Sequence, residues 1–151
     1  MVAVGTLHAC AVQTGGALWC WGDNGAGEIG DGTTTTRVRP LPITALTNVA
    51  QVSAGGDDTC AIQGDGTLWC WGDNSAGELG NGTTTDAASP VRVTALTSVA
   101  QVSTAGDHVC AVLTDGTLWC WGHNMLGPLG DGTQTNNQPQ LQPVGVTLRC
   151  P

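Results

Sequence analysis

The stretch Thr-Leu-Trp-Cys-Trp-Gly at residues 67–72 decides the fold of this chain, because its last four residues recur at a fixed interval. Trp-Cys-Trp-Gly occurs at residues 19–22, 69–72 and 119–122, and the copies are 50 residues apart with no insertion. Three repeats of this length account for essentially all of the 151 residues. A fixed period of this size is typical of proteins that stack copies of one supersecondary unit.

Each repeat reads as a series of short strands. In the second repeat, the segments 49–54, 59–63 and 67–71 are expected to be strands, because turn residues bound them and β-branched or aromatic residues are frequent in them. Gly64-Asp65-Gly66 fits a three-residue hairpin loop. A fourth strand is expected at 89–94, where a proline suits an edge position. Helical periodicity is absent, so the sequence predicts an all-β protein.

The repeats predict three tandem four-stranded propeller-type blades in a single repeat domain over residues 1–151. Blade 1 is expected at about 1–47, blade 2 at about 48–97 and blade 3 at about 98–147. Residues 148–151 would then begin the first strand of a next blade. Three blades make an incomplete β-propeller, which we expect to close or extend by oligomerisation.

The third repeat reads Ala-Gly-x-His-x-Cys-Ala-Val at 105–112, Asp-Gly-Thr-Leu-Trp-Cys-Trp-Gly at 115–122 and Gly-x-Asn-x-x-Gly-x-Leu-Gly-x-Gly at 122–132. This pattern resembles the regulator of chromosome condensation repeat, and the likeness extends over all three repeats. The resemblance implies a β-propeller, which in this family usually closes with seven blades, so a set of three departs from it. The paired cysteines are similar to those of secreted bacterial members of the family.

Six of the seven cysteines are predicted to form disulfides within the hairpins. The register of the hairpin loop places the two cysteines of each repeat opposite each other, which pairs Cys10 with Cys20, Cys60 with Cys70 and Cys110 with Cys120. Directly opposed Cα atoms lie about 4.5–5.5 Å apart, within the reach of a disulfide. Reduced buried thiols are the alternative. The nine residues between paired cysteines do not match the tight Cys-x2-Cys spacing of structural zinc sites.

Three disulfides imply an oxidising compartment, so we expect a secreted or extracellular protein, on the exterior of a bacterial cell. The first residues, 1–4, do not form a signal peptide, so either a leader has been removed or the chain was cut from a longer one. Cys150 has no partner in its own repeat and is either a free thiol or an intermolecular cysteine. Asn81 begins the single glycosylation sequon, which either carries a glycan or only serves the turn.

The charge balance excludes two classes of partner. Four arginines, no lysine and twelve acidic residues give a net charge of −8. A chain without a basic surface cannot replace the counterions along nucleic-acid phosphates, and it does not dock on anionic lipid. No apolar run approaches the ~20 residues of a membrane span. We therefore expect no nucleic-acid partner and no membrane span.

No residue stands out as catalytic. The sequence lacks a Gly-x-Ser-x-Gly elbow, a phosphate-binding loop and a His-Glu-x-x-His zinc helix. The carboxylates recur with the repeat, so none is set apart as an acid or a base. We expect no enzyme, no cofactor and no catalytic residue.

Two sets of residues have side chains that could bind a metal ion. The loop at 23–32 is rich in oxygen ligands of the kind that calcium prefers, but the third repeat has histidine and proline at two of its acidic positions. We therefore predict a structural turn. His8, Asp58 and His108 fall at one repeat position, yet equivalent positions on neighbouring blades diverge with distance from the axis. The sequence thus predicts no metal site.

The tryptophans are predicted to pack between blades. Side chains alternate along a strand, so the two tryptophans of each repeat share one face, whereas the leucine and cysteine beside them share the other. An aromatic ligand platform is the alternative. The residues concerned are Trp19, Trp21, Trp69, Trp71, Trp119 and Trp121.

The terminal repeats carry the same apolar residues as the middle one, so their outer faces are expected to associate. We predict a non-catalytic extracellular structural protein, whose blades stack head to tail between chains into a ring or filament. The alternatives are a propeller module that binds another protein through the loops of one face, like an inhibitor or adhesin, and a fragment of a longer propeller. The repeats differ most at a candidate partner patch of His123, Met125, Leu126 and Pro128.

Overall fold

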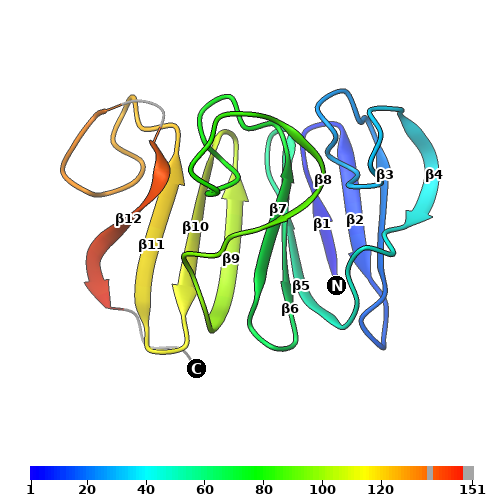
Figure 1. The fold of residues 1–151 in the computed structure, drawn as a ribbon, viewed down its shortest axis with the longest axis horizontal. Helices are drawn as coiled ribbons and strands as arrows, with labels where there is room; N and C mark the ends of the chain where they lie inside the picture. The colour runs from blue at the N-terminus through cyan, green and yellow to red at the C-terminus, as the bar shows by residue number, and fades with distance from the viewer. Residues whose placement is uncertain (136–137, 148–151) are drawn as a thin grey trace.

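The structure is a computed structural model that describes residues 1–135 and 138–147, and these residues form three four-stranded antiparallel sheets. The sheets stand side by side as three blades (Figure 1). Blade 1 consists of β1 (Val2–Val4), β2 (His8–Val12), β3 (Leu18–Gly22) and β4 (Arg37–Pro42). Blade 2 consists of β5 (Val49–Ala54), β6 (Asp58–Gln63), β7 (Leu68–Gly72) and β8 (Ala87–Arg92). Blade 3 consists of β9 (Val99–Ala105), β10 (His108–Leu113), β11 (Thr117–Gly122) and β12 (Gln138–Thr147).

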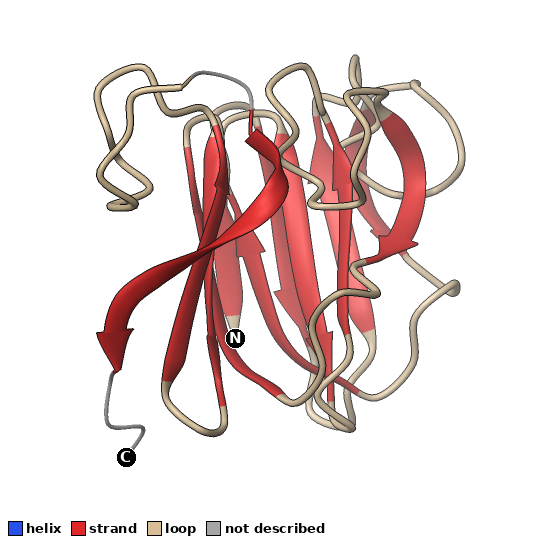
Figure 2. Cartoon of the chain, turned by 60° about the vertical axis from the view of Figure 1, so that its left-hand side comes forward, coloured by secondary structure: helices blue, strands red, loops and turns tan. Residues whose placement is uncertain are grey.

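Each blade is a meander in which sequential strands are neighbours in the sheet. The first strands, β1, β5 and β9, contact one another, and the fourth strand is the outer edge. Figure 2 shows strands and loops only. The described residues include no helix of the length and hydropathy that crossing a bilayer requires. The prediction of an all-β fold with three four-stranded blades is confirmed, and an incomplete propeller agrees with it.

The hairpin between the second and third strands has the register that the sequence predicts. The cysteines of each repeat are directly opposed, with Cα atoms 4.1 Å apart, and the bonded pairs are Cys10–Cys20, Cys60–Cys70 and Cys110–Cys120. The S–S distances are 2.11, 2.15 and 2.06 Å in the same order. Each blade is therefore closed at its middle by a covalent bond. Cys150 and the strand start expected at 148–151 lie outside the described residues.

The fourth strand of blade 2 lies at Ala87–Arg92, so the prediction of 89–94 is wrong by two residues at each end. The cause is a shift in register between Cys70 and Gly72 of the neighbouring strand. This bulge uses additional residues of β8, so pairing begins directly after the turn. Pro90 lies in the unpaired part of the bulge, where its missing N–H breaks no ladder hydrogen bond.

Buried apolar side chains form two clusters, and each cluster fills one junction between neighbouring blades. The clusters use equivalent residues: Leu18, Ile29, Val52 and Trp71 at the first junction, and Leu68, Leu79, Val102 and Trp121 at the second. Apolar burial is thus concentrated between the blades rather than inside them. As in other repeat proteins, stability depends on the contact between neighbouring units.

The double substitution Cys60→Ala and Cys70→Ala is expected to lower the free energy of unfolding by about 2–3 kcal/mol, because the bond restricts the unfolded chain. Both cysteines are fully buried, so loss of packing acts in the same direction. Urea denaturation followed by tryptophan fluorescence measures the change. Fully reduced wild-type protein is the control and should lose at least as much. A double variant as stable as the oxidised wild type would contradict the expectation.

Candidate functional site: the blade junctions

Each junction contains a tryptophan of one blade that enters the long turn of the blade before it. The indole N–H of Trp71 donates to the carbonyl of Glu28 at 2.7 Å, and that of Trp121 donates to the carbonyl of Glu78 at 2.6 Å. Both indoles are fully buried. The turn needs a glycine beside the ring, because a Cβ at Gly30 would lie 2.7 Å from Trp71 Nε1. The tryptophan and the turn are the two halves of one contact.

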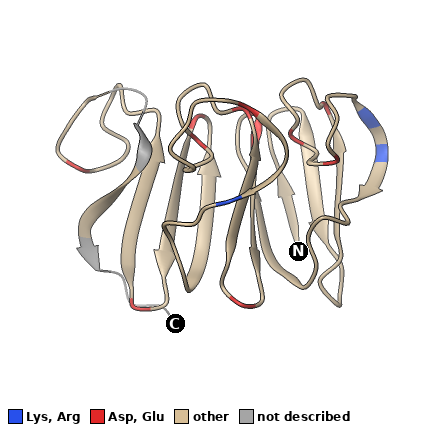
Figure 3. Cartoon of the chain, viewed as in Figure 1, with Lys and Arg blue, Asp and Glu red and all other residues tan. Residues whose placement is uncertain are grey.

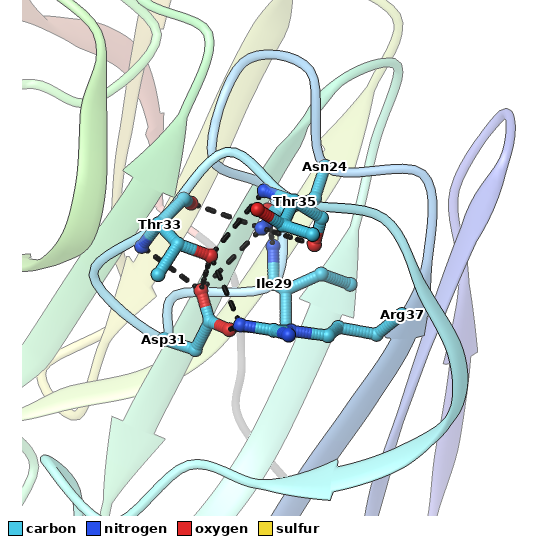
Figure 4. Close-up of polar contacts among 6 residues, drawn as sticks. All are labelled: Asn24, Ile29, Asp31, Thr33, Thr35 and Arg37. Carbon is cyan, nitrogen blue, oxygen red and sulfur yellow. Dashed lines mark hydrogen bonds and ion pairs between the residues drawn. The ribbon is translucent and has the colours of Figure 1, made fainter.

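The turn that receives the tryptophan is held by a buried asparagine (Figure 4). The side-chain oxygen of Asn24 accepts the N–H of Ile29 at 2.9 Å. Its side-chain nitrogen donates to the carbonyls of Thr33 and Thr35 at 2.9 and 3.1 Å. The equivalent asparagines of the other two blades are also fully buried. One amide thus ties the two ends of the turn together in every blade.

Carboxylate oxygens of this turn that a cation would need already accept hydrogen bonds from the turn itself and from Arg37. Asp31 Oδ1 accepts the N–H and the hydroxyl of Thr33 at 3.0 and 2.7 Å, and Arg37 Nε donates to Oδ2 at 2.7 Å (Figure 4). In blade 2, the sequon residue Asn81 takes the place of this aspartate and accepts the same two bonds from Thr83, at 3.0 and 2.7 Å. Within the described residues, no group of three or more His, Cys, Asp or Glu side chains is placed to hold a metal ion.

The first junction has a chain of hydrogen bonds at its polar end. His8 Nε2 lies 2.8 Å from the hydroxyl of Thr59, and this hydroxyl donates to the carbonyl of Glu28 at 2.9 Å. The hydroxyl has a single proton, so the imidazole must be the donor in the first contact. Burial lowers the pKa of His8, and this outweighs the opposite effect of Asp57 and Asp23. The neutral imidazole, the hydroxyl and the carbonyl therefore satisfy one another.

The second junction lacks this chain. Asp58 takes the place of His8, and Val109 takes the place of the threonine, so no hydroxyl is present. Within the described residues, neither carboxylate oxygen of Asp58 has a hydrogen-bond partner, and the same holds for Oε1 of Glu78. His108, the third residue at this repeat position, is half-buried on blade 3. The three residues thus lie on three different blades.

The inner strands and the turns that follow them are linked by hydrogen bonds that run from each blade to the next. Thr6 N–H donates to the carbonyl of Gly56 at 3.1 Å, and Gly56 N–H donates to the carbonyl of Gly106 at 3.1 Å. Gln51 also clamps the backbone of Val102: its Nε2 donates to the carbonyl at 2.8 Å, and its Oε1 accepts the N–H at 3.3 Å. These bonds fix the order in which blades stack.

The outer faces of blades 1 and 3 carry the separate halves of the junction contact. Trp21 is half-buried, and its indole N–H has no hydrogen-bond partner among the described residues. At Gly130 of blade 3, a Cβ would meet Val144 at 3.4 Å, whereas the other two turns hold a tryptophan there. Gln101, the equivalent of the clamping glutamine, is exposed. The remaining predicted packing tryptophans are half-buried: Trp19, Trp69 and Trp119.

The predicted partner patch lies on the long turn of blade 3. Met125 and Leu126 are 56% and 87% exposed, Pro128 is exposed, and His123 is half-buried. In blade 1 the same turn is covered by β8, where the carbonyl of Ala88 accepts a backbone hydrogen bond of 2.8 Å from the turn. The structure therefore brings the four predicted residues together on one turn, two of them as an exposed apolar pair.

Charge is distributed unevenly between the two ends of the blades (Figure 3). The end with the long turns carries the acidic residues, except for Asp65 and Asp115, which lie on hairpins at the other end. Of the described arginines, Arg37 and Arg39 lie on β4 and Arg92 ends β8. The turn end therefore presents a negative field, which disfavours phosphates and other anionic ligands.

A hollow of about 640 Å³ lies beside the hairpins, and amide groups such as those of Gln51, Gln63 and Gln101 line it. Asp65 is the one carboxylate in this lining, which contains no histidine or cysteine. A nucleophile activated by an adjacent base needs both side chains within hydrogen-bond reach of each other. This hollow does not provide them.

Comparison with known proteins gives one family. The model described as Regulator of chromosome condensation (RCC1) repeat matches residues 15–62 and 65–112, and a second model with the same description matches 49–78. The human E3 ubiquitin-protein ligase HERC2 is 47% identical over 45 residues, which are 30% of this chain and 1% of that protein.

Solved structures share the fold. Human WBSCR16 has a TM-score of 0.82 at 23% identity, over 95% of this chain and 38% of that one. Prp20p from Saccharomyces cerevisiae, described with its binding properties to Gsp1p and histones, has a TM-score of 0.83 at 20% identity, over 97% and 38%. Yeast RCC1 (Prp20) bound to Kap60 has a TM-score of 0.83 at 21% identity, over 97% and 37%. This chain thus spans well under half the length of these proteins.

Thr59→Val is expected to lower the free energy of unfolding by about 1–3 kcal/mol, because it leaves the buried imidazole of His8 without its partner. Valine occupies the equivalent position 109, so the substitution fits sterically. Urea denaturation measures the loss, and Thr59→Ser, which keeps the hydroxyl, is the control. Equal losses in both variants would show that the hydroxyl has no role.

Asn74→Asp is expected to lower the free energy of unfolding by about 3 kcal/mol or more, because the carboxylate would be buried against carbonyl oxygens. The amide nitrogen it replaces donates to the carbonyls of Thr83 and Thr85 at 3.1 and 3.0 Å. Thermal unfolding by circular dichroism gives the change. The matched control is Asp73→Asn, a change of similar size at the neighbouring, half-buried position. If Asn74→Asp unfolds at the wild-type temperature, the asparagine does not hold the turn.

Proposed function

This chain belongs to the regulator of chromosome condensation (RCC1) repeat family, and from that premise we propose that it is a non-catalytic interaction module whose blades stack head to tail between copies. The observation that carries this proposal is the separation of one repeated contact into its two halves. The buried pair of indole and turn closes both junctions, and the outer faces of blades 1 and 3 each carry one half of it.

The outer faces match in three places. The indole N–H of Trp21 would donate to the carbonyl of Pro128 in another copy, as Trp71 and Trp121 donate to the turns before them. Gly106 N–H would donate to the carbonyl of Thr6, which continues the bonds along the inner strands. Gln101 would clamp the backbone of the next first strand, as Gln51 clamps Val102. The residue that these contacts require is already present at each position.

Contacts of this kind join unlike faces, so they close into a ring or extend into a filament, depending on the rotation between copies. The three disulfides favour an oxidising compartment, and we place the assembly outside the cell, with a bacterial exterior as the setting. Cys150 would add a covalent link between copies if it forms an intermolecular disulfide.

A second candidate function is binding of a different protein through the turn of blade 3. The exposed pair Met125 and Leu126, flanked by His123 and Pro128, favours it, because exposed apolar residues on loops are common binding anchors. Family relatives bind other proteins: Prp20p is described with Gsp1p and histones, and yeast RCC1 was solved with Kap60. This mode uses the turn that carries the Pro128 carbonyl, so it would compete with head-to-tail stacking at the outer face of blade 3.

Light scattering after size-exclusion chromatography, over a range of concentrations, tests the assembly. We expect a wild-type mass at a multiple of the 15.3 kDa chain that rises with concentration. Gly130→Ala is expected to shift the mass to the monomer, since a Cβ there would meet the incoming indole as it would at Gly30. Loss of the assembly in Cys150→Ser, which keeps the three hairpin disulfides, would assign it to Cys150.

Gly132→Ala is the matched control for this experiment. Gly130 and Gly132 both have positive φ, at 67° and 82°, so alanine is strained at both. No described atom lies within 4 Å of a Cβ at Gly132, so this variant should assemble like wild type. A wild-type protein that stays monomeric at every concentration would overturn head-to-tail stacking and favour the loop-binding alternative.

A further inference from the structure

Two buried carboxyl groups lie at the second junction without a counter-charge. Asp58 and Glu78 are each 1% exposed. Both oxygens of Asp58 and Oε1 of Glu78 have no hydrogen-bond partner among the described residues, and Glu78 Oε2 accepts the N–H of Ala76 at 2.9 Å. A buried, unpaired carboxylate costs several kcal/mol, so groups in this position retain a proton instead.

The charged groups that act on Asp58 are all acidic. They are Glu78 and Asp73 on the turn side of blade 2, and Asp107 between β9 and β10 of blade 3. The same Asp73 and Asp107 act on Glu78. Every neighbouring charge therefore favours the protonated form of the pair.

At the first junction, the position equivalent to Asp58 holds an uncharged, hydrogen-bonded side chain. There His8 takes the place of Asp58, and its imidazole is bonded to the hydroxyl of Thr59, which donates to the backbone carbonyl of Glu28. At the second junction the histidine is an aspartate and the threonine is Val109, while the glutamate is kept. The two junctions share their apolar contacts and differ in this polar part: at the second junction, an aspartate without a hydrogen-bond partner among the described residues replaces the bonded imidazole.

We propose that Asp58 and Glu78 form a proton-retaining pair that makes the junction between blades 2 and 3 the pH-sensitive seam of the protein. The seam is closed while the pair holds its protons. It weakens when both groups ionise, because two buried carboxylates on blade 2 are then charged, without a counter-charge, and are repelled by Asp107 of blade 3. This device lies inside the chain and does not depend on assembly between copies.

The direction of the pH dependence follows from the pKa values. Burial, followed by the charge of Glu78, raises the pKa of Asp58 well above its ordinary value, and burial raises the pKa of Glu78 to about 7. The folded chain therefore holds protons that the unfolded chain has released above about pH 4–4.5. Stability is full below that range and falls as the pH rises, with the loss from Glu78 complete above about 7.

Urea unfolding of wild type, Asp58→Asn and Glu78→Gln at pH 5 and pH 8 tests the proposal. For each protein, the equilibrium constant of unfolding at pH 8 is divided by that at pH 5, and this ratio is compared between wild type and variants. The comparison is needed because His8 and Glu28 also have shifted pKa values and contribute to the pH dependence of every protein. We expect the wild-type ratio to exceed that of Asp58→Asn or Glu78→Gln by about tenfold or more, since one unit of pKa shift corresponds to a factor of ten.

The control is Asp65→Asn, which should keep the wild-type ratio. Asp65 is exposed, and its hydrogen bonds with Thr67 lower its pKa, so it titrates below pH 5. If one of the two variants does not fold, the other still decides the question. A wild-type ratio equal to that of Asp58→Asn and of Glu78→Gln would overturn the proposal.

Hydrogen exchange locates the effect within the molecule. The N–H of Gly56 is bonded across the second junction, to Gly106, and the N–H of Thr6 is bonded across the first, to Gly56. After correction for intrinsic exchange, protection of the Gly56 amide should fall more from pH 5 to pH 8 than protection of the Thr6 amide. Equal behaviour of the two amides would show that the seam is not at the second junction.

Discussion

The hydrogen bond from a buried indole to a turn carbonyl of the preceding blade is the contact on which the rest of the structure depends. It occurs at both junctions, from Trp71 and from Trp121, with distances of 2.7 and 2.6 Å. An indole N–H without a partner in such a place would be costly, so the turn must present its carbonyl at one position. The asparagine in each turn and the glycine beside the ring are consequences of that demand.

The blade itself has a different role from the junction. Its disulfide and its hairpin hold four short strands in register, but the large buried side chains lie between blades. A single blade therefore resembles one unit of a repeat protein, which cannot bury its apolar faces alone. The interaction function proposed for the outer faces would use the same contacts that stabilise the fold.

The features that depend on the repeat, namely the number of blades and the pairing of the cysteines, could be predicted from the sequence. The spacing of Trp-Cys-Trp-Gly indicated three blades, and the hairpin loop set the cysteine register, because both depend on contacts between residues close in the chain. The start of β8 was missed, since the shift in register opposite Trp71 is a property of the paired strands that no local residue pattern indicates. The burial of Asp58 and Glu78 was missed too. A signal was available: position 58 breaks the histidine shared by positions 8 and 108, and position 109 replaces a threonine by valine.

The two junctions have equivalent apolar contacts but different polar contacts, and this difference bears on the order in which they open. Stability in a repeat protein is close to a sum of terms for units and for interfaces, so unequal interfaces make unfolding begin at the weaker one. The first junction satisfies its polar groups with His8 and Thr59, whereas the second leaves carboxylate oxygens unpaired. Blade 3 is attached through that second junction only. If the second junction opens first, as proposed, blade 3 separates and the apolar face of blade 2 that it covers becomes exposed.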